Sequence, residues 1–241
     1  MTRTALVTGA SRGIGKAVVQ RLLADGVRVC GLYRTEGEAA QLLAKELDAA
    51  SPKGIALQCD VSDEQQVHAA VARCAEEFGG IDVLVNNAGV ATFSLLENLE
   101  RAHWDSMFAT NVTGPYLVTR AVLPLMGPGA SIVTITSGLA VTGAPGKTHY
   151  AASKAALIGF TKALSREVGR RDIRVNAIAP GIIETEMSAV GLNPELRARY
   201  EGQCALGRIG QSPELAEVVA FLADHRSSYV NGQTLMVDGG L

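Results

Sequence analysis

The chain has 241 residues, of which 22 are basic and 24 acidic, so its formal net charge is −2 at pH 7. This balance, without any basic cluster along the chain, argues against a nucleic-acid-binding protein. Hydrophobic residues make up 47% of the chain, enough for a large core, yet no apolar run has the length of a membrane span and no signal-peptide pattern opens the sequence, so we expect a cytoplasmic protein without a membrane partner.

Strand and helix patterns alternate from the first residues to the last. An apolar run at Thr4–Thr8 predicts the first strand, and apolar residues at helical spacing follow from Ile14. The further expected strands are 27–33, 54–60, 81–87, 130–137, 173–180 and 233–239. The further expected helices are 38–50, 63–79 with Ser62 as N-cap, about 95–100, 103–126, about 150–170 and 212–224, and the stretch 181–211 is polar and loop-rich.

This alternation predicts a parallel sheet with helices on both faces. No linker, composition break or internal repeat divides the chain. We therefore expect an α/β fold: a single doubly wound Rossmann domain over residues 1–241, with a mostly parallel seven-stranded sheet flanked by helices.

Cysteine and histidine residues are scattered. The four cysteines form no C-x-x-C pair, which favours a reduced intracellular protein over a disulfide scaffold. The four histidines lack metal-ligand spacing, so we expect no metal site.

The stretch TGASRGIG at residues 8–15 lies on the turn from the first strand to the first helix. Glycines at 9, 13 and 15 remove side chains there, so a ligand can approach the backbone closely. The helix N-terminus offers unpaired N–H groups and a partial positive charge, which suit a phosphate. Taken alone, the loop leaves a tight turn without a ligand as an equal alternative.

Ligands of this fold bind beyond the carboxyl ends of the strands, where the strand order reverses. Small, polar or turn-forming residues stand at these ends: the glycine-rich loop, Tyr33-Arg34, Asp60-Val61, Asn86-Asn87-Ala88-Gly89, Ser137 and Pro180-Gly181. Together they favour a long nucleotide cofactor over an empty crevice.

The end of the second strand indicates which nicotinamide cofactor is used. NAD-specific sites usually place an acid there, which binds the ribose 2′-hydroxyl. Here Tyr33 and Arg34 occupy the position, and the first acid is Glu36. An acid would repel a 2′-phosphate, whereas Arg34 and Arg12 can bind it through charge-assisted hydrogen bonds. We expect NADP(H); the alternative is a permissive site with two surface arginines.

Tyr150 and Lys154 stand four residues apart near the start of a helix, so they share a face and can point into one cleft. A free tyrosine has a pKa of about 10. A nearby cation favours the phenolate, so we expect Lys154 to lower the pKa of Tyr150. An isolated Y-x-x-x-K occurs often by chance, but here it follows Ser137 at a strand end.

These motifs, in this order, resemble those of the short-chain dehydrogenase/reductase family from the first strand to the last. The matching residues are Thr8 to Gly15, Asn86-Asn87-Ala88-Gly89, Asn111, Ser137, Tyr150-x-x-x-Lys154 and Pro180-Gly181. Within the family the chain is most similar to 3-oxoacyl-(acyl carrier protein) reductases and related ketoreductases.

The resemblance implies a catalytic tetrad of Asn111, Ser137, Tyr150 and Lys154, with Tyr150 as proton donor while the nicotinamide delivers hydride. Thr185 resembles the family's carboxamide-binding threonine; a helix cap is the alternative. The full set of expected cofactor contacts is Gly9, Ser11, Arg12, Gly13, Ile14, Gly15, Arg34, Asp60, Val61, Asn87, Ala88, Gly89, Tyr150, Lys154, Pro180, Gly181, Ile183 and Thr185.

The expected reaction is NADPH-dependent reduction of a ketone, with a β-ketoacyl or polyketide-like substrate, as in fatty acid or polyketide biosynthesis. The resemblance makes 181–211 a substrate lid, with Met187, Val190, Leu192 and Leu206 as candidate pocket residues, and implies a homotetramer. A carrier-protein docking patch is weakly marked, with mainly Arg170 and Arg171 at the expected entrance side. An alcohol or sugar dehydrogenase and a non-catalytic NADP-binding sensor are the alternatives.

Overall fold

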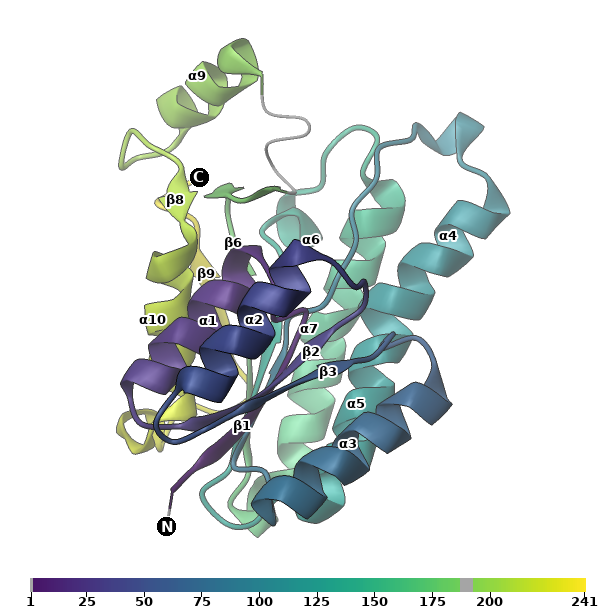
Figure 1. Cartoon of the computed structure of the whole chain (residues 1–241). Helices are drawn as coiled ribbons and strands as arrows, with labels where there is room; N and C mark the ends of the chain where they lie inside the picture. Colours follow the sequence, from purple (N-terminus) through teal and green to yellow (C-terminus); the bar gives the residue numbers. More distant parts are fainter. Residues whose placement is uncertain (1, 187–192) are drawn as a thin grey trace.

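The computed structural model describes residues 2–186 and 193–241 (Figure 1). Its main sheet has seven strands in the order β3-β2-β1-β4-β5-β6-β9, and every pairing is parallel. The strands are β1 (Thr4–Thr8), β2 (Arg28–Tyr33), β3 (Ile55–Gln58), β4 (Val83–Asn86), β5 (Ser131–Ile135), β6 (Arg174–Pro180) and β9 (Thr234–Val237). The predicted α/β architecture and all seven predicted strands are confirmed.

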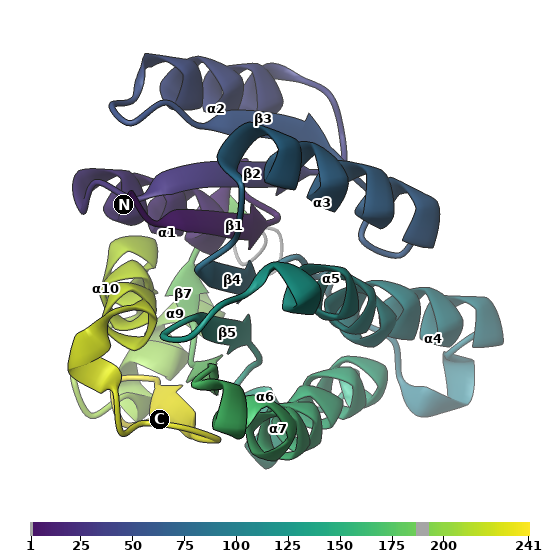
Figure 2. The same cartoon turned by 90° about the horizontal axis from the view of Figure 1, so that it is seen from below.

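Helices cover both faces of this sheet (Figure 2). One face carries α1 (Gly13–Ala24), α2 (Glu38–Ala49) and α10 (Ser212–Ala223). The other face carries α3 (Glu64–Phe78), α5 (Gly114–Val122) and α7 (Thr148–Val168). On the same side, α4 (Arg101–Phe108) packs against α7 (Figure 2). Apolar side chains of each helix layer pack on the sheet and form two separate core clusters. Burial of these side chains is the dominant force that holds the layers together.

The strand order reverses between β1 and β4, because the chain first adds β2 and β3 on one side of β1 and then continues from β4 on the other. In this fold such a switch point opens a crevice at the carboxyl ends of the strands. The glycine-rich turn, which leads from β1 into α1, lies at the carboxyl ends of the strands. The fold therefore places the predicted phosphate loop and the residues after β4 side by side.

Several local features differ from the sequence prediction. The helix predicted at 103–126 is interrupted by a π-helical turn at Ala109–Thr113, and only Leu96–Asn98 of the predicted helix at 95–100 forms a 3₁₀ turn. The N-cap of α3 is Asp63, which accepts hydrogen bonds from the Gln65 and Gln66 amides, and not Ser62. The Ser62 hydroxyl instead donates a hydrogen bond to the Asp60 carboxylate.

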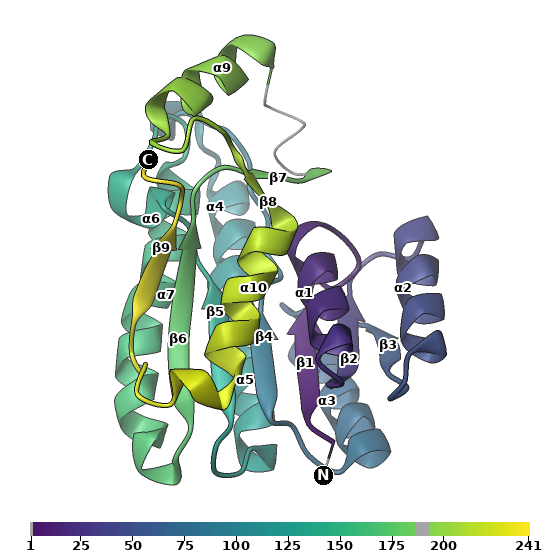
Figure 3. The same cartoon turned by 90° about the vertical axis from the view of Figure 1, so that its left-hand side faces the viewer.

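The stretch 181–211 contains more regular structure than its composition suggests. Figure 3 shows the short strands β7 (Ile183–Glu184) and β8 (Gly210–Gln211) paired with each other, and α9 (Pro194–Gln203) above them. A short helix, α6 (Leu139–Thr142), also follows β5 and was not predicted. Three of the expected lid residues, Met187, Val190 and Leu192, lie outside the described residues. Leu206 is 66% exposed.

None of the helices in the described part of the chain combines the length and the apolar character that a membrane-spanning helix needs.

Candidate active site

The glycine-rich turn is built so closely that side chains would not fit. Gly9 and Gly13 have φ angles of +64° and +53°, which L side chains rarely adopt. A Cβ on Gly15 would collide with the carbonyl oxygen of Gly9 and lie 2.5 Å from Nδ2 of Asn87. The turn therefore requires glycine at three positions for backbone reasons, as the sequence predicts for a loop that a ligand approaches.

The start of α1 leaves its amide groups available to a ligand. Its N-cap, Arg12, makes no side-chain capping hydrogen bond, and no acidic residue lies in the first turn. A helix start without a cap has unpaired N–H groups and a partial positive charge. This turn fits the phosphate groups of a dinucleotide, because the backbone donors and the field both favour an anion.

The loop after β4 is fastened to the glycine-rich turn through Thr8. The Thr8 hydroxyl accepts hydrogen bonds from the Asn87 and Ala88 amides, both at 3.0 Å. The Asn87 side chain returns hydrogen bonds to the carbonyl oxygens of Thr8 and Gly9 at 2.9 and 3.1 Å. Asn87 is thus a structural link between β1 and β4, and Ala88 and Gly89 follow it in the loop after β4.

Asn111 lies on the π-helical turn and is fully buried. Its Oδ1 accepts from the Val90 amide at 2.8 Å, and its Nδ2 donates to the Val90 carbonyl at 3.0 Å and to Ser153 Oγ at 3.0 Å. The Ser153 hydroxyl in turn donates to the Tyr150 carbonyl at 2.7 Å. A π turn widens the helix, and such turns often mark functional sites. Sequence reasoning missed Ser153, although it stands between Tyr150 and Lys154.

Lys154 is 96% buried, since its exposed fraction is 4%. Its Nζ donates to the Ile135 carbonyl at 2.9 Å, at the end of β5. A Cβ on Gly89 would lie 3.3 Å from both this Nζ and Asn111 Oδ1, so the three residues converge. Burial lowers the pKa of Lys154 from 10.5 to about 8, because the charged form is disfavoured away from water.

Tyr150 and Ser137 are brought together from α7 and the end of β5. Burial raises the pKa of Tyr150 above its usual value of 10.0 and outweighs the nearby Ser137 side chain, which lowers it. The prediction that Lys154 lowers this pKa is wrong for the protein by itself: its Nζ lies 6.0 Å from the centre of the Tyr150 ring and is itself desolvated. The phenol is therefore protonated at neutral pH.

The expected 2′-phosphate ligands are exposed at the carboxyl end of the sheet. Arg34 is exposed, and its carbonyl accepts a hydrogen bond from the Gln58 side chain at 3.1 Å. Arg12 is 65% exposed and lies 3.6 Å from the Glu186 carboxylate. Glu36 is the first acidic residue after β2 in the sequence. Its carboxylate accepts a hydrogen bond from the Tyr33 hydroxyl at 2.7 Å.

The remaining expected contacts lie at the same end of the sheet. Asp60 follows β3, where its carboxylate accepts from the Ser62 amide, and Val61 is buried against Gly114. Beyond β6, the Gly181 amide donates to the Val237 carbonyl at 3.0 Å. A Cβ on Gly13 would lie 3.4 Å from the Thr185 methyl group, so the segment after Pro180 returns to the glycine-rich turn.

Three other expected cofactor contacts are located by the turn, helix or strand that carries them. Ser11 is half-buried in the glycine-rich turn, Ile14 is in the first turn of α1, and Ile183 is buried in β7. All members of the predicted site thus lie on the carboxyl side of the sheet.

Arg170 and Arg171 lie far from this site within the chain. They follow the last turn of α7, a helix of 21 residues and so about 30 Å in length, whose first turn carries Tyr150. Arg171 donates to the carbonyls of Leu123 and Met126 at the amino ends of the strands. The expectation that both mark the entrance side is therefore wrong for a single chain, because the helix separates them from Tyr150.

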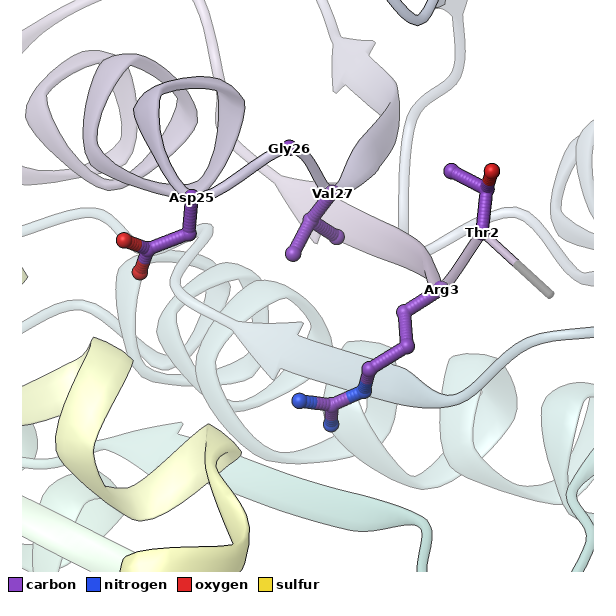
Figure 4. Close-up of a pocket in the computed structure, with 5 residues that line it drawn as sticks. All are labelled: Thr2, Arg3, Asp25, Gly26 and Val27. Atoms are coloured by element: carbon purple, nitrogen blue, oxygen red, sulfur yellow. The ribbon is translucent and has the colours of Figure 1, made fainter.

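Two hollows on the surface also lie away from the site. One is lined by Thr2, Arg3, Asp25, Gly26 and Val27, at the amino ends of β1 and β2 (Figure 4). The other lies beside the start of β6 and includes Arg174 and Tyr229. Neither contains a predicted site residue. Within residues 2–186 and 193–241 no group of three or more metal-binding side chains is close enough to hold an ion.

Comparisons with known proteins agree with this geometry. A family model described as enoyl-(acyl carrier protein) reductase matches residues 9–241. The 3-oxoacyl-(acyl-carrier-protein) reductase FabG of Staphylococcus aureus is 38% identical over 243 residues, which cover 100% of this chain and 98% of that protein.

Solved structures are equally similar. A short-chain dehydrogenase from Burkholderia cenocepacia, in complex with NADP, superposes with a TM-score of 0.94 and 38% identity, covering 99% of this chain and 97% of that one. A blue fluorescent protein from a metagenomic library, in complex with NADPH, gives a TM-score of 0.94 and 37% identity over the same shares.

Proposed function

Because the chain belongs to the short-chain dehydrogenase/reductase family, we propose that it is an NADPH-dependent ketoreductase that converts a ketone to a secondary alcohol. The observation that carries this proposal is the convergence of Tyr150, Ser137 and Lys154 at the carboxyl ends of the strands, next to an uncapped glycine-rich turn. The relatives named for 3-oxoacyl-(acyl-carrier-protein) reduction support a β-ketoacyl substrate.

In this proposal Tyr150 is the proton donor. Its raised pKa keeps the phenol protonated at neutral pH, which suits donation to a carbonyl oxygen. The Ser137 hydroxyl holds the same oxygen and stabilises its developing negative charge. NADPH, when bound, supplies the hydride. The ionised form of Lys154 holds the ribose hydroxyls and offers positive charge to Tyr150 as the phenol loses its proton.

Asn111 has a positioning role in the same site. Both ends of its side chain amide are bound to the Val90 backbone, so it holds the loop after β4 against the π turn. Through Ser153 it also reaches the Tyr150 carbonyl. By the family resemblance, its turn would organise a water that connects Lys154 to solvent.

The cofactor-binding residues of the sequence prediction are proposed with their positions in the structure. The turn from Gly9 to Gly15 binds the phosphates, and Arg34 with Arg12 binds the 2′-phosphate. Asp60, Val61, Asn87, Ala88 and Gly89 border the adenosine and nicotinamide sides of the crevice. Pro180, Gly181, Ile183 and Thr185 close it from the end of β6. The two solved relatives that contain NADP or NADPH support this choice of cofactor.

The proposed substrate is a β-ketoacyl thioester or a similar polyketide-like ketone, presented free or on an acyl carrier protein. A single domain over 1–241 with a lid at about 181–211 and a homotetrameric assembly complete the proposal. Leu206 is exposed, and α9 has no buried residue and is tied to β7 by the Arg197–Glu184 ion pair. These exposed surfaces support a lid that needs a further partner. The protein is expected to act in the cytoplasm.

A substrate panel and one pair of variants test the proposal. Purified protein is mixed with acetoacetyl and longer β-ketoacyl thioesters, with NADPH or NADH, and absorbance at the nicotinamide band is followed. We expect reduction with NADPH, and near-complete loss of turnover in Tyr150→Phe while NADPH binding persists. An enoyl thioester serves as the comparison substrate, because it has a carbon–carbon double bond in place of the β-ketone and the matching family model is described as an enoyl-(acyl carrier protein) reductase.

Oxidation of secondary alcohols with NAD, without reduction of any β-keto substrate, would refute the proposed direction. Wild-type turnover in Tyr150→Phe would refute the proposed proton donor.

A further inference from the structure

Two side chains from the start of α7 bind a single residue of the loop that follows β4. His149 Nε2 and Thr92 Oγ1 are hydrogen-bonded at 2.7 Å. Lys147 Nζ donates to the Thr92 carbonyl at 3.1 Å. Two residues on, the Ser94 amide donates to the Gly146 carbonyl at 3.0 Å. The loop is therefore held to the segment that leads into Tyr150 by side chains and backbone together.

Phe93 lies between these contacts. Its ring covers Gly146 so closely that a Cβ at that glycine would collide with it, and Gly146 has a φ angle of +70°. The Phe93 side chain is nevertheless 69% exposed. A large apolar ring that is held in place but left open to solvent is suited to contact an apolar ligand.

The loop begins at the candidate active site. Gly89 borders Lys154 and Asn111, and Asn111 holds Val90 by two hydrogen bonds. Thr92 is two residues further along the chain, and His149 directly precedes Tyr150. Only Ala91 lies between Val90, which Asn111 holds, and Thr92, which His149 holds. The position of Thr92 therefore sets where Phe93 stands relative to Tyr150.

We propose that His149 is a positioning residue for the substrate: through Thr92 it holds the 90–94 loop, with Phe93, as the apolar wall of the substrate cleft beside Tyr150. The proposal rests on the proposed ketoreductase function, because it concerns the substrate of that same site. It assigns no proton transfer to His149.

The surroundings of His149 favour this role over that of an ordinary core residue. The ring is 0% exposed, and its Nδ1 has no hydrogen-bond partner among the described residues. An apolar side chain would fill this space without an unpaired buried nitrogen, which costs free energy. Compared with an apolar side chain of similar size, His149 contributes the hydrogen bond to Thr92. Burial and the nearby Lys147 and His103 lower the pKa of His149, which keeps the ring neutral.

Thr92→Val tests the proposal, because it removes the hydroxyl at an exposed position and keeps the shape of the side chain. We expect KM for the β-keto thioester to rise about three- to tenfold, the range for one hydrogen bond of ordinary strength. The kcat and the KM for NADPH should stay unchanged. Thr92→Ser, which keeps the hydroxyl, should restore the KM. Thr148→Val is the matched control, since it removes an exposed hydroxyl next to His149.

Hydrogen exchange supplies a readout that does not depend on activity. The amides of residues 90–96 should exchange faster in Thr92→Val and in His149→Phe, but not in Thr148→Val. In the double variant Thr92→Val/His149→Phe, the ketone KM should be no higher than in the worse single variant, because both remove the same contact.

A normal ketone KM in Thr92→Val overturns the positioning role, whatever the exchange rates are. An equal rise in the NADPH KM overturns it as well, because the loop would then act on the cofactor. If the wild-type protein reduces no ketone, the proposed function fails first and the substrate role falls with it, which the wild-type assay shows separately.

Discussion

The buried Lys154 ammonium group donates a hydrogen bond to the backbone carbonyl of Ile135 at 2.9 Å. The carbonyl is a dipole and not a full negative charge, so it offsets only part of the cost of burying the ammonium. This explains why the pKa of Lys154 is lowered to about 8. A nearly buried lysine of this kind is unfavourable for stability, and its presence here is consistent with its place in the candidate active site.

The lowered pKa predicts how stability depends on pH. Between about pH 8 and 10.5 the unfolded lysine keeps its proton while the folded one loses it, so the free energy of unfolding rises with pH through this window. Relative to Lys154→Met, the wild type should gain up to about 3 kcal/mol across it. Urea unfolding of both proteins at pH 7, 9 and 10 measures the difference. If the free energies of unfolding of the two proteins changed equally with pH, the pKa of Lys154 would not be lowered in the folded protein.

Arg34→Asp should change the cofactor preference. The substitution replaces attraction to a 2′-phosphate by repulsion, so the KM for NADPH should rise and NADH should be used better. Loss of one charge-assisted contact costs roughly 1.5–3 kcal/mol, about ten- to a hundredfold in affinity. Arg170→Asp is the control, because Arg170 is exposed at the far end of α7. An unchanged ratio of NADPH to NADH use would place the 2′-phosphate elsewhere.

Gly15→Ala should weaken both the fold and cofactor binding. The new methyl group would collide with the Gly9 carbonyl and with Asn87, so α1 must move away from the turn. Overpacking of this kind costs about 1–3 kcal/mol. Denaturant unfolding and NADPH fluorescence titration measure the two effects. Gly202→Ala is the matched control, since a Cβ there meets nothing within 4 Å, and a similar loss in that variant would contradict the steric explanation.

Gly159→Leu should separate the fold of the chain from its assembly. Gly159 is exposed in the middle of α7, and a Cβ there meets nothing within 4 Å, so a single chain can accommodate the larger side chain. If α7 packs against a second copy, as proposed for the homotetramer, the leucine would block the close approach of the helices. Light scattering should then show smaller species while circular dichroism is unchanged. A wild-type monomer at micromolar concentration would exclude the assembly itself.

Local patterns were sufficient to predict most of the architecture. The period of apolar residues located all seven strands of the main sheet, because a buried strand needs a continuous apolar run whatever its neighbours are. The spacing of Gly9, Gly13 and Gly15 indicated a turn that excludes side chains, and the structure confirms the steric need. The four-residue spacing of Tyr150 and Lys154 placed both on one side of α7.

Other features depend on contacts between residues far apart in the chain. The Thr92–His149 hydrogen bond joins residues 57 positions apart, and the Asn111–Ser153 bond joins residues 42 apart. No local pattern indicates which of two loops will meet. The π turn at Asn111 likewise forms where the side chain can bind Val90, which the helical period of 103–126 does not show.

The sequence by itself thus determined the order of the elements, the glycine-rich turn and the residue types of the site, because backbone sterics and apolar periodicity act over a few residues. Only the tertiary structure decided the environment of those residues. It raised the pKa of Tyr150 where a nearby cation was expected to lower it, and it separated Arg171 from Tyr150 by the length of α7. The physical reason is that desolvation depends on everything packed around a group, and packing exists only once the whole chain has folded.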